Sequence, residues 1–95
     1  MKPLTLSDRV SVPDAVVSRE LDGETVLLNL DTGIYFGLDA VATDMWRAVQ
    51  ESGLLQDVFE SACGRYEVDP AVLREDLLKL VNQLAAKGLL QAVDR

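Results

Sequence analysis

Three short runs rich in apolar residues occupy the first half of the chain and are separated by turn residues, and the first run alternates in part between apolar and polar positions. The runs cover Ala15 to Leu21, Thr25 to Leu30 and Ile34 to Leu38, and they are rich in β-branched and aromatic residues, as strands are. Asp22-Gly23 suits a two-residue hairpin because both turn positions need positive φ. Asp31-Thr32-Gly33 suits a bulged turn, with its glycine in the left-handed position. The pattern predicts a three-stranded antiparallel meander.

The apolar period lengthens after residue 39 from two to about 3.6, which predicts helices. Asp39 is a suitable N-cap for a helix from Ala40 to Glu51, which Ser52-Gly53 would end. A second helix is expected from Leu55 to Cys63, and the glycine that follows it either ends this helix or only weakens it.

Asp69-Pro70 opens a third and longer helix, because the aspartate can cap it and proline is favoured at the first helical position. Lys87-Gly88 would close it. Leu89 to Val93 could form a last short strand. The fold class expected is α+β, with a three-stranded antiparallel sheet followed by three helices in a winged helix-turn-helix-like arrangement. The apolar residues of the third helix are Leu73, Leu77, Leu80, Val81 and Leu84.

The segment of residues 1–14 has two prolines and no clear period, so we expect a flexible N-terminal segment or a loosely attached strand. Residues 15–95 are expected to form a single small domain. The N-terminus has no apolar run fit for a signal peptide, and no stretch reaches about 18 consecutive apolar residues. These features predict a cytoplasmic protein that does not enter a membrane.

The composition removes most catalytic and metal chemistry. The chain has no histidine and one cysteine, so it lacks the commonest general base and metal ligand and cannot form an intrachain disulfide. Cys63 lies on the apolar side of its predicted helix without a histidine to activate it, which favours a buried hydrophobic role. The carboxylates match no calcium-loop spacing. We therefore expect no catalytic residue, no metal and no cofactor, and a binding protein rather than an enzyme.

The charge disfavours nucleic acid and anionic membranes as partners. Nine Lys and Arg stand against sixteen Asp and Glu, a net charge of −7, whereas a nucleic-acid binder normally presents a basic patch. A winged-helix DNA-binding transcription regulator remains the alternative function because the shape class fits. Its third helix, however, would set Arg74, Lys79 and Lys87 against Glu75 and Asp76, which is close to neutral.

The third predicted strand is terminal in its sheet, and such an edge can accept a strand from another chain. It has bulky residues on both faces, with Ile34, Phe36 and Leu38 on one and Tyr35 on the other, whereas a half-solvated strand needs only one apolar face. Tyr35 could equally be an ordinary exposed aromatic residue. The same open edge would also allow a strand-swapped homodimer.

The run from Leu28 to Asp39, LNLDTGIYFGLD, with Trp46 seven residues beyond it, resembles the PqqD-like family. Tyr66-Glu67-Val68-Asp69 and Gly88-Leu89-Leu90 fit the same pattern, so the resemblance covers about residues 15–93. Members are RiPP recognition elements, which bind the leader segment of a ribosomally made precursor peptide. The resemblance implies a three-stranded sheet with three helices, in which the leader adds as a strand to the third strand and lies against the third helix.

Carried onto this sequence, the resemblance implies a peptide-binding site on the third strand and third helix. Leu28, Leu38 and Trp46 match core positions of the family, and Leu77 and Leu80 could also be wholly used by the core. The implied peptide-binding residues are Ile34, Tyr35, Phe36, Gly37, Leu38, Leu73, Asp76, Leu77, Leu80 and Val81.

Free-standing members of the family act with radical SAM enzymes, as in pyrroloquinoline quinone synthesis, or in lasso-peptide pathways, where a separate leader peptidase receives the complex. The segment after Gly33 is more similar to the lasso-type members. The resemblance thus implies a stand-alone peptide chaperone whose partners are a precursor peptide and one of these enzymes.

Overall fold

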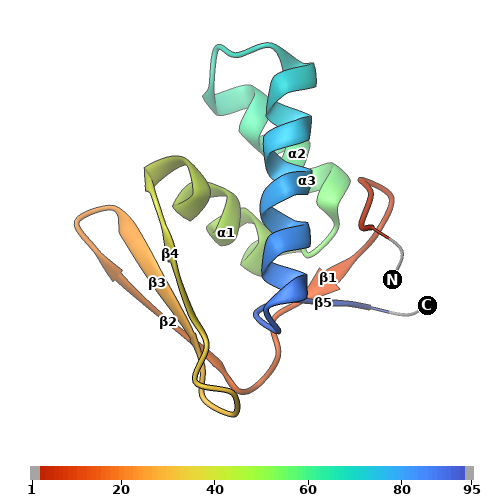
Figure 1. The fold of residues 1–95 in the computed structure, drawn as a ribbon. Coiled ribbons are helices and arrows are strands. Elements are labelled where there is room, and N and C mark those ends of the chain that lie inside the picture. Colours follow the sequence, from red (N-terminus) through yellow and green to blue (C-terminus); the bar gives the residue numbers. More distant parts are fainter. Residues whose placement is uncertain (1–2, 94–95) are drawn as a thin grey trace.

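The computed structural model describes residues 3–93 and has the expected α+β architecture. An antiparallel sheet in the order β2-β3-β4 is followed by three helices, which confirms the predicted fold class. Figure 1 shows these three strands as one sheet on one side of the helices, with β1 and β5 on the other side. The elements are β1 (Val10–Ser11), β2 (Val16–Leu21), β3 (Glu24–Asn29), β4 (Tyr35–Leu38), α1 (Ala40–Ser52), α2 (Leu55–Arg65), α3 (Pro70–Ala86) and β5 (Gln91–Ala92).

The two predicted turns of the sheet are present. Asp22 and Gly23 have φ of 55° and 82°, as a two-residue hairpin requires, and Gly33 has φ of 77°. Strand β4 begins one residue later than predicted because Ile34 still belongs to the turn. Its N–H donates to Thr32 Oγ1 at 3.2 Å rather than to β3.

Local capping sets the helix ends. Asp39 Oδ1 accepts from the Ala42 N–H at 2.8 Å, and Asp69 Oδ1 accepts from the Ala71 N–H at 2.9 Å. Gly53 ends α1 in the left-handed conformation. Gly64 does not end α2, which continues to Arg65, two residues beyond the predicted end.

The core lies between the inner face of the sheet and the helices. Strand β3 alternates strictly, with Thr25, Leu27 and Asn29 buried and Glu24 and Val26 exposed. The first three point toward the helices. No helix among residues 3–93 is long and apolar enough to cross a membrane. The buried apolar side chains contributed by the helices are Met45, Trp46, Val49, Leu55, Val58, Ala62, Leu73, Leu77, Val81 and Leu84.

The described part of the N-terminal segment lies against the helices. Strand β1 pairs antiparallel with β5, and Val10 is buried. The Leu4 N–H donates to Asn82 Oδ1 on α3 at 2.7 Å. The last strand is shorter than predicted, because Leu89 and Leu90 enter the core before β5 begins. Flexibility of residues 1–14 stays a prediction, and residues 1–2 and 94–95 lie outside the described part.

The same substitution, glycine to alanine, at two positions tests how the backbone conformation contributes to stability. Gly53→Ala should lower the free energy of unfolding by about 2 kcal/mol, because φ is strained for alanine. The new Cβ would also lie 2.7 Å from the Val10 carbonyl oxygen. Gly64→Ala should raise the free energy of unfolding by about 0.5–1 kcal/mol, because alanine has the higher helix propensity and no atom lies within 4 Å of the new Cβ. Urea unfolding measures both, and effects of the same sign would contradict this account.

Candidate functional site

Strand β4 forms one edge of the sheet. The strand order is β2-β3-β4, and within residues 3–93 no other strand pairs with the outer side of β4 (Figure 1). An edge strand presents backbone donors and acceptors that can pair with an added strand. The backbone of β4 is therefore the first element of the candidate site.

The register decides which backbone groups of β4 are free. The Asn29 N–H donates to the Ile34 carbonyl at 2.9 Å, which starts the ladder between β3 and β4. Hydrogen-bonded and non-hydrogen-bonded pairs alternate in an antiparallel ladder, so Phe36 and Leu38 bond to Leu27 and Thr25. The N–H and C=O groups of Tyr35 and Gly37 consequently point away from β3, toward the open side.

The side chains of β4 alternate between the two faces of the sheet. Phe36 is half-buried and Leu38 is buried, both on the inner face. Tyr35 points the other way and is 73% exposed, and Gly37 leaves its position on the outer face without a side chain. Ile34, in the preceding turn, is 40% exposed.

The C-terminal end of α3 lies close to β4 and to the turn that precedes it. Lys87 Nζ lies 5.8 Å from the centroid of the Phe36 ring, and Asn29 Nδ2 donates to the Gly88 carbonyl at 2.8 Å. Residues spaced by three, four, seven and eleven positions share one face of a helix. By this spacing Asp76, Leu80 and Gln83 lie on the same side of α3 as Lys87, the residue that caps it, and this side is named here the α3 flank.

The ten predicted site residues divide into two groups. The first group is at least partly accessible: Leu80 is half-buried and Asp76 is exposed on α3, and the four residues from Ile34 to Gly37 are exposed or half-buried in β4 and the turn before it. The side chains of the other four are buried in the core. For the three on α3, the prediction could not exclude this outcome, because the apolar period of a helix does not separate core positions from flanking ones. In this structure they can act on a peptide only by positioning β4 and α3. The four are Leu38, Leu73, Leu77 and Val81.

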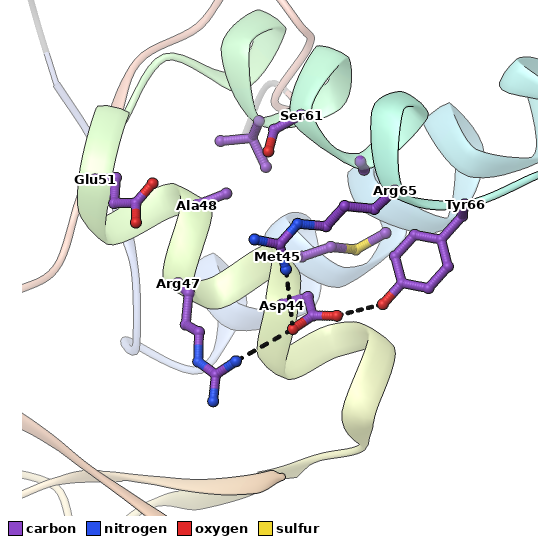
Figure 2. A pocket seen from close by; sticks show the side chains of 10 residues that line it. Asp44, Met45, Arg47, Ala48, Glu51, Ser61, Arg65 and Tyr66 are labelled. Atoms are coloured by element: carbon purple, nitrogen blue, oxygen red, sulfur yellow. Dashed lines mark hydrogen bonds and ion pairs between the residues drawn. The ribbon is translucent and has the colours of Figure 1, made fainter.

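A polar cluster around Asp44 was not predicted as a site. Figure 2 shows the Asp44 carboxylate held by Tyr66, Arg47 and Arg65, beside a cavity of about 50 Å³. The Tyr66 hydroxyl donates to Oδ2, and the two guanidinium groups lie 3.3 and 3.4 Å from Oδ1. Arg47 also pairs with Glu20 of β2. Asp44 and Arg47 are three residues apart on α1, and Arg65 and Tyr66 are adjacent at the end of α2. No sequence spacing connects these two pairs with each other, because they come from separate elements.

The Asp44 cluster is suited to structure rather than to chemistry. The carboxylate has three donors around it, and no histidine exists in the chain to act as a base. Its contacts join α1 to the end of α2 and, through Glu20, to the sheet. Within residues 3–93, no group of three or more potential metal-binding side chains comes together.

The fold and the open β4 edge define a small α+β domain whose sheet can accept an added strand. The family model described as Coenzyme PQQ synthesis protein D (PqqD) matches residues 24–90. The chain therefore belongs to the PqqD family, as its resemblance indicated.

A solved structure with substantial similarity supports this assignment. It is described as TbiB1 in complex with the TbiA(beta) leader peptide, and it is 39% identical with a TM-score of 0.81. The similarity covers 88% of this chain and 98% of TbiB1. No curated protein matches the chain.

The Asp44 cluster makes a pH-dependent prediction. The pKa of Tyr66 is raised above the ordinary 10.0, mainly by the hydrogen bond from its hydroxyl to the Asp44 carboxylate and next by burial. A raised pKa in the folded state means that the protonated form stabilises the fold, so this stabilisation is complete below pH 10 and is lost as the pH rises through the raised pKa. Tyr66→Phe should remove the component of tyrosinate absorbance whose pKa lies above the ordinary 10.0.

Unfolding measured at increasing alkaline pH supplies the second readout. The wild type should lose stability relative to Tyr66→Phe as the pH rises, because the variant has no phenol to ionise there. Asp44→Asn serves as the matched control, since removing the negative charge should lower the pKa of Tyr66 toward its ordinary value. Parallel pH profiles for wild type and Tyr66→Phe would show that this contact carries no pH-dependent stability.

Proposed function

We propose that this protein is a non-catalytic recognition domain that binds the leader segment of a ribosomally synthesised precursor peptide. The leader adds as a strand to the open edge of β4. The observation that carries the proposal is the outward direction of the Tyr35 and Gly37 backbone groups on an edge strand. The similarity to TbiB1, whose structure contains a leader peptide, supports it.

Strand addition divides affinity and selectivity between backbone and side chains. The backbone groups of Tyr35 and Gly37 supply hydrogen bonds that any sequence can accept. Alternate side chains of the leader then point inward, toward Phe36 and Leu80, where apolar residues are favoured. Asp76 and Lys87 lie on the same α3 flank, eleven residues or about 16 Å apart along the helix. They would favour opposite charges at the two ends of the bound segment.

The bound leader would then be presented to an enzyme that acts on the precursor. The likeness of the segment after Gly33 to lasso-type members favours a leader peptidase as that enzyme over a radical SAM enzyme. A DNA-binding role is disfavoured because the chain has a net charge of −7 and the α3 flank has one cation and one anion.

Proline substitution tests the strand-addition mechanism. Tyr35→Pro and Gly37→Pro each remove one outward N–H without removing a hydrogen bond to β3. Each should weaken leader binding about tenfold or more, equivalent to roughly 1.4 kcal/mol. Fluorescence anisotropy with the labelled TbiA(beta) leader, and with leaders of precursors encoded beside this gene, measures the affinity.

Ser18→Pro on β2 is the matched control. Its N–H also points away from β3, because the two-residue hairpin makes Leu21 and Glu24 a hydrogen-bonded pair and places Ser18 at an alternate position. This variant alters the opposite edge of the same sheet and should bind like the wild type. Normal binding by both folded β4 variants would exclude strand addition at β4, and no binding of any of these leaders to the wild type would exclude leader recognition.

A further inference from the structure

The face of the sheet that points away from the helices, named here the outer face, is apolar. By the strand register, Val17, Val26 and Tyr35 share this face, and they are 45%, 51% and 73% exposed. Leu21, at the hairpin end, is also 73% exposed. Leu28 is half-buried between them and lines a shallow hollow with Val17 and Val26. Arg19 is the charged residue in this central region.

Such a face is unusual for a sheet that already covers a core. An antiparallel sheet with one face on the core normally presents polar side chains to water on the other. Monomeric soluble proteins rarely expose contiguous apolar patches larger than a few hundred Å², and large exposed patches mark interaction sites. The inner face already covers the core with Leu27 and Leu38, so the outer residues contribute nothing to it. The outer face is therefore suited to a partner.

The outer face is continuous with the β4 edge. Tyr35 and Gly37 supply the outward backbone groups of that edge, and their side-chain positions lie on the outer face. No atom lies within 4 Å of a Cβ built on Gly37, so the face is open there. Because side chains alternate along a strand, every second residue of an added leader would extend the same surface. A partner that covers the outer face would thus contact both the protein and its bound peptide.

Charges at the two ends of the sheet indicate the chemistry of that partner. Asp22 lies in the β2–β3 turn, Glu24 directly follows it, and Asp31 lies in the β3–β4 turn, all exposed. A complementary surface would have an aliphatic centre flanked by Lys and Arg. A second copy of this chain fits less well, because it would bring another −7 charge and the same acids to the contact.

We propose that the outer face is the docking surface for the enzyme that receives the bound leader, and that this enzyme covers it with an aliphatic patch flanked by basic residues. This inference rests on the proposed function, since the receiving enzyme is defined by the leader. It adds the surface through which the loaded protein is recognised.

The double variant Val17→Thr/Val26→Thr tests the docking surface. Threonine keeps the β-branched shape that strands favour and removes the apolar character. Val68→Thr/Val93→Thr is the matched control, because these valines are 46% and 40% exposed outside both the outer face and the β4 edge. Leader affinity is measured first, by anisotropy. The rate at which the peptidase or radical SAM enzyme encoded beside the precursor processes that precursor is then measured at increasing concentrations of each variant.

The outer-face variant should bind the leader within twofold of the wild type but require at least tenfold more protein for half-maximal processing. The control should match the wild type in both assays. Equal processing by the two double variants would overturn the proposal, as would a parallel loss of leader affinity in the outer-face variant. A wild-type dimer in sedimentation that Val17→Thr/Val26→Thr dissociates would assign the face to a second copy instead. Failure of the wild type to bind any leader would reject the proposed function itself.

Discussion

The alternation of hydrogen bonds between β3 and β4 is the constraint on which the binding surface depends. The same period of two directs both the backbone groups and the side chains of each residue. In Phe36 and Leu38, therefore, the side chain points to the inner face of the sheet and the backbone groups bond to β3. In Tyr35 and Gly37 the side-chain position lies on the outer face and the backbone groups point to the open edge. A shift of one residue would exchange the two sets, so burial of Leu38 also fixes which amides are offered to a peptide.

Two sets of polar contacts join the sheet to the helices, one at each end of the sheet. The buried Asn29 accepts from the Asp31 and Thr32 N–H groups in the β3–β4 turn and donates to the Gly88 carbonyl after α3. One side chain thus connects the start of β4 to the end of its flanking helix. At the other end of the sheet, the pair between Glu20 and Arg47 joins β2 to α1. These contacts join the β3–β4 turn to the end of α3, and the sheet to α1.

Features set by neighbouring residues were predictable from the sequence, and those set by tertiary contacts were not. The Asp22-Gly23 turn and the Asp39 cap depend on φ preferences and capping within a few residues, and both are present. The role of Gly64 was left open, because packing rather than propensity decides whether a helix continues through a glycine. On α3, the apolar pattern could not separate buried Leu77 from half-buried Leu80, since that difference arises from how α3 packs against the other elements of the core. The Asp44 cluster joins distant segments, and only the folded chain reveals it.

The central claim, that the β4 edge receives the leader as a strand, is tested most directly by amide hydrogen exchange with and without a saturating leader peptide. The Tyr35 and Gly37 amides should exchange rapidly in the free protein and at least about tenfold more slowly in the complex, because they acquire hydrogen-bond acceptors. The Phe36 and Leu38 amides, already bonded to β3, should be protected in both states. Unchanged exchange at Tyr35 and Gly37 in the saturated complex, or slowing at Ser18 and Glu20 instead, would contradict the account.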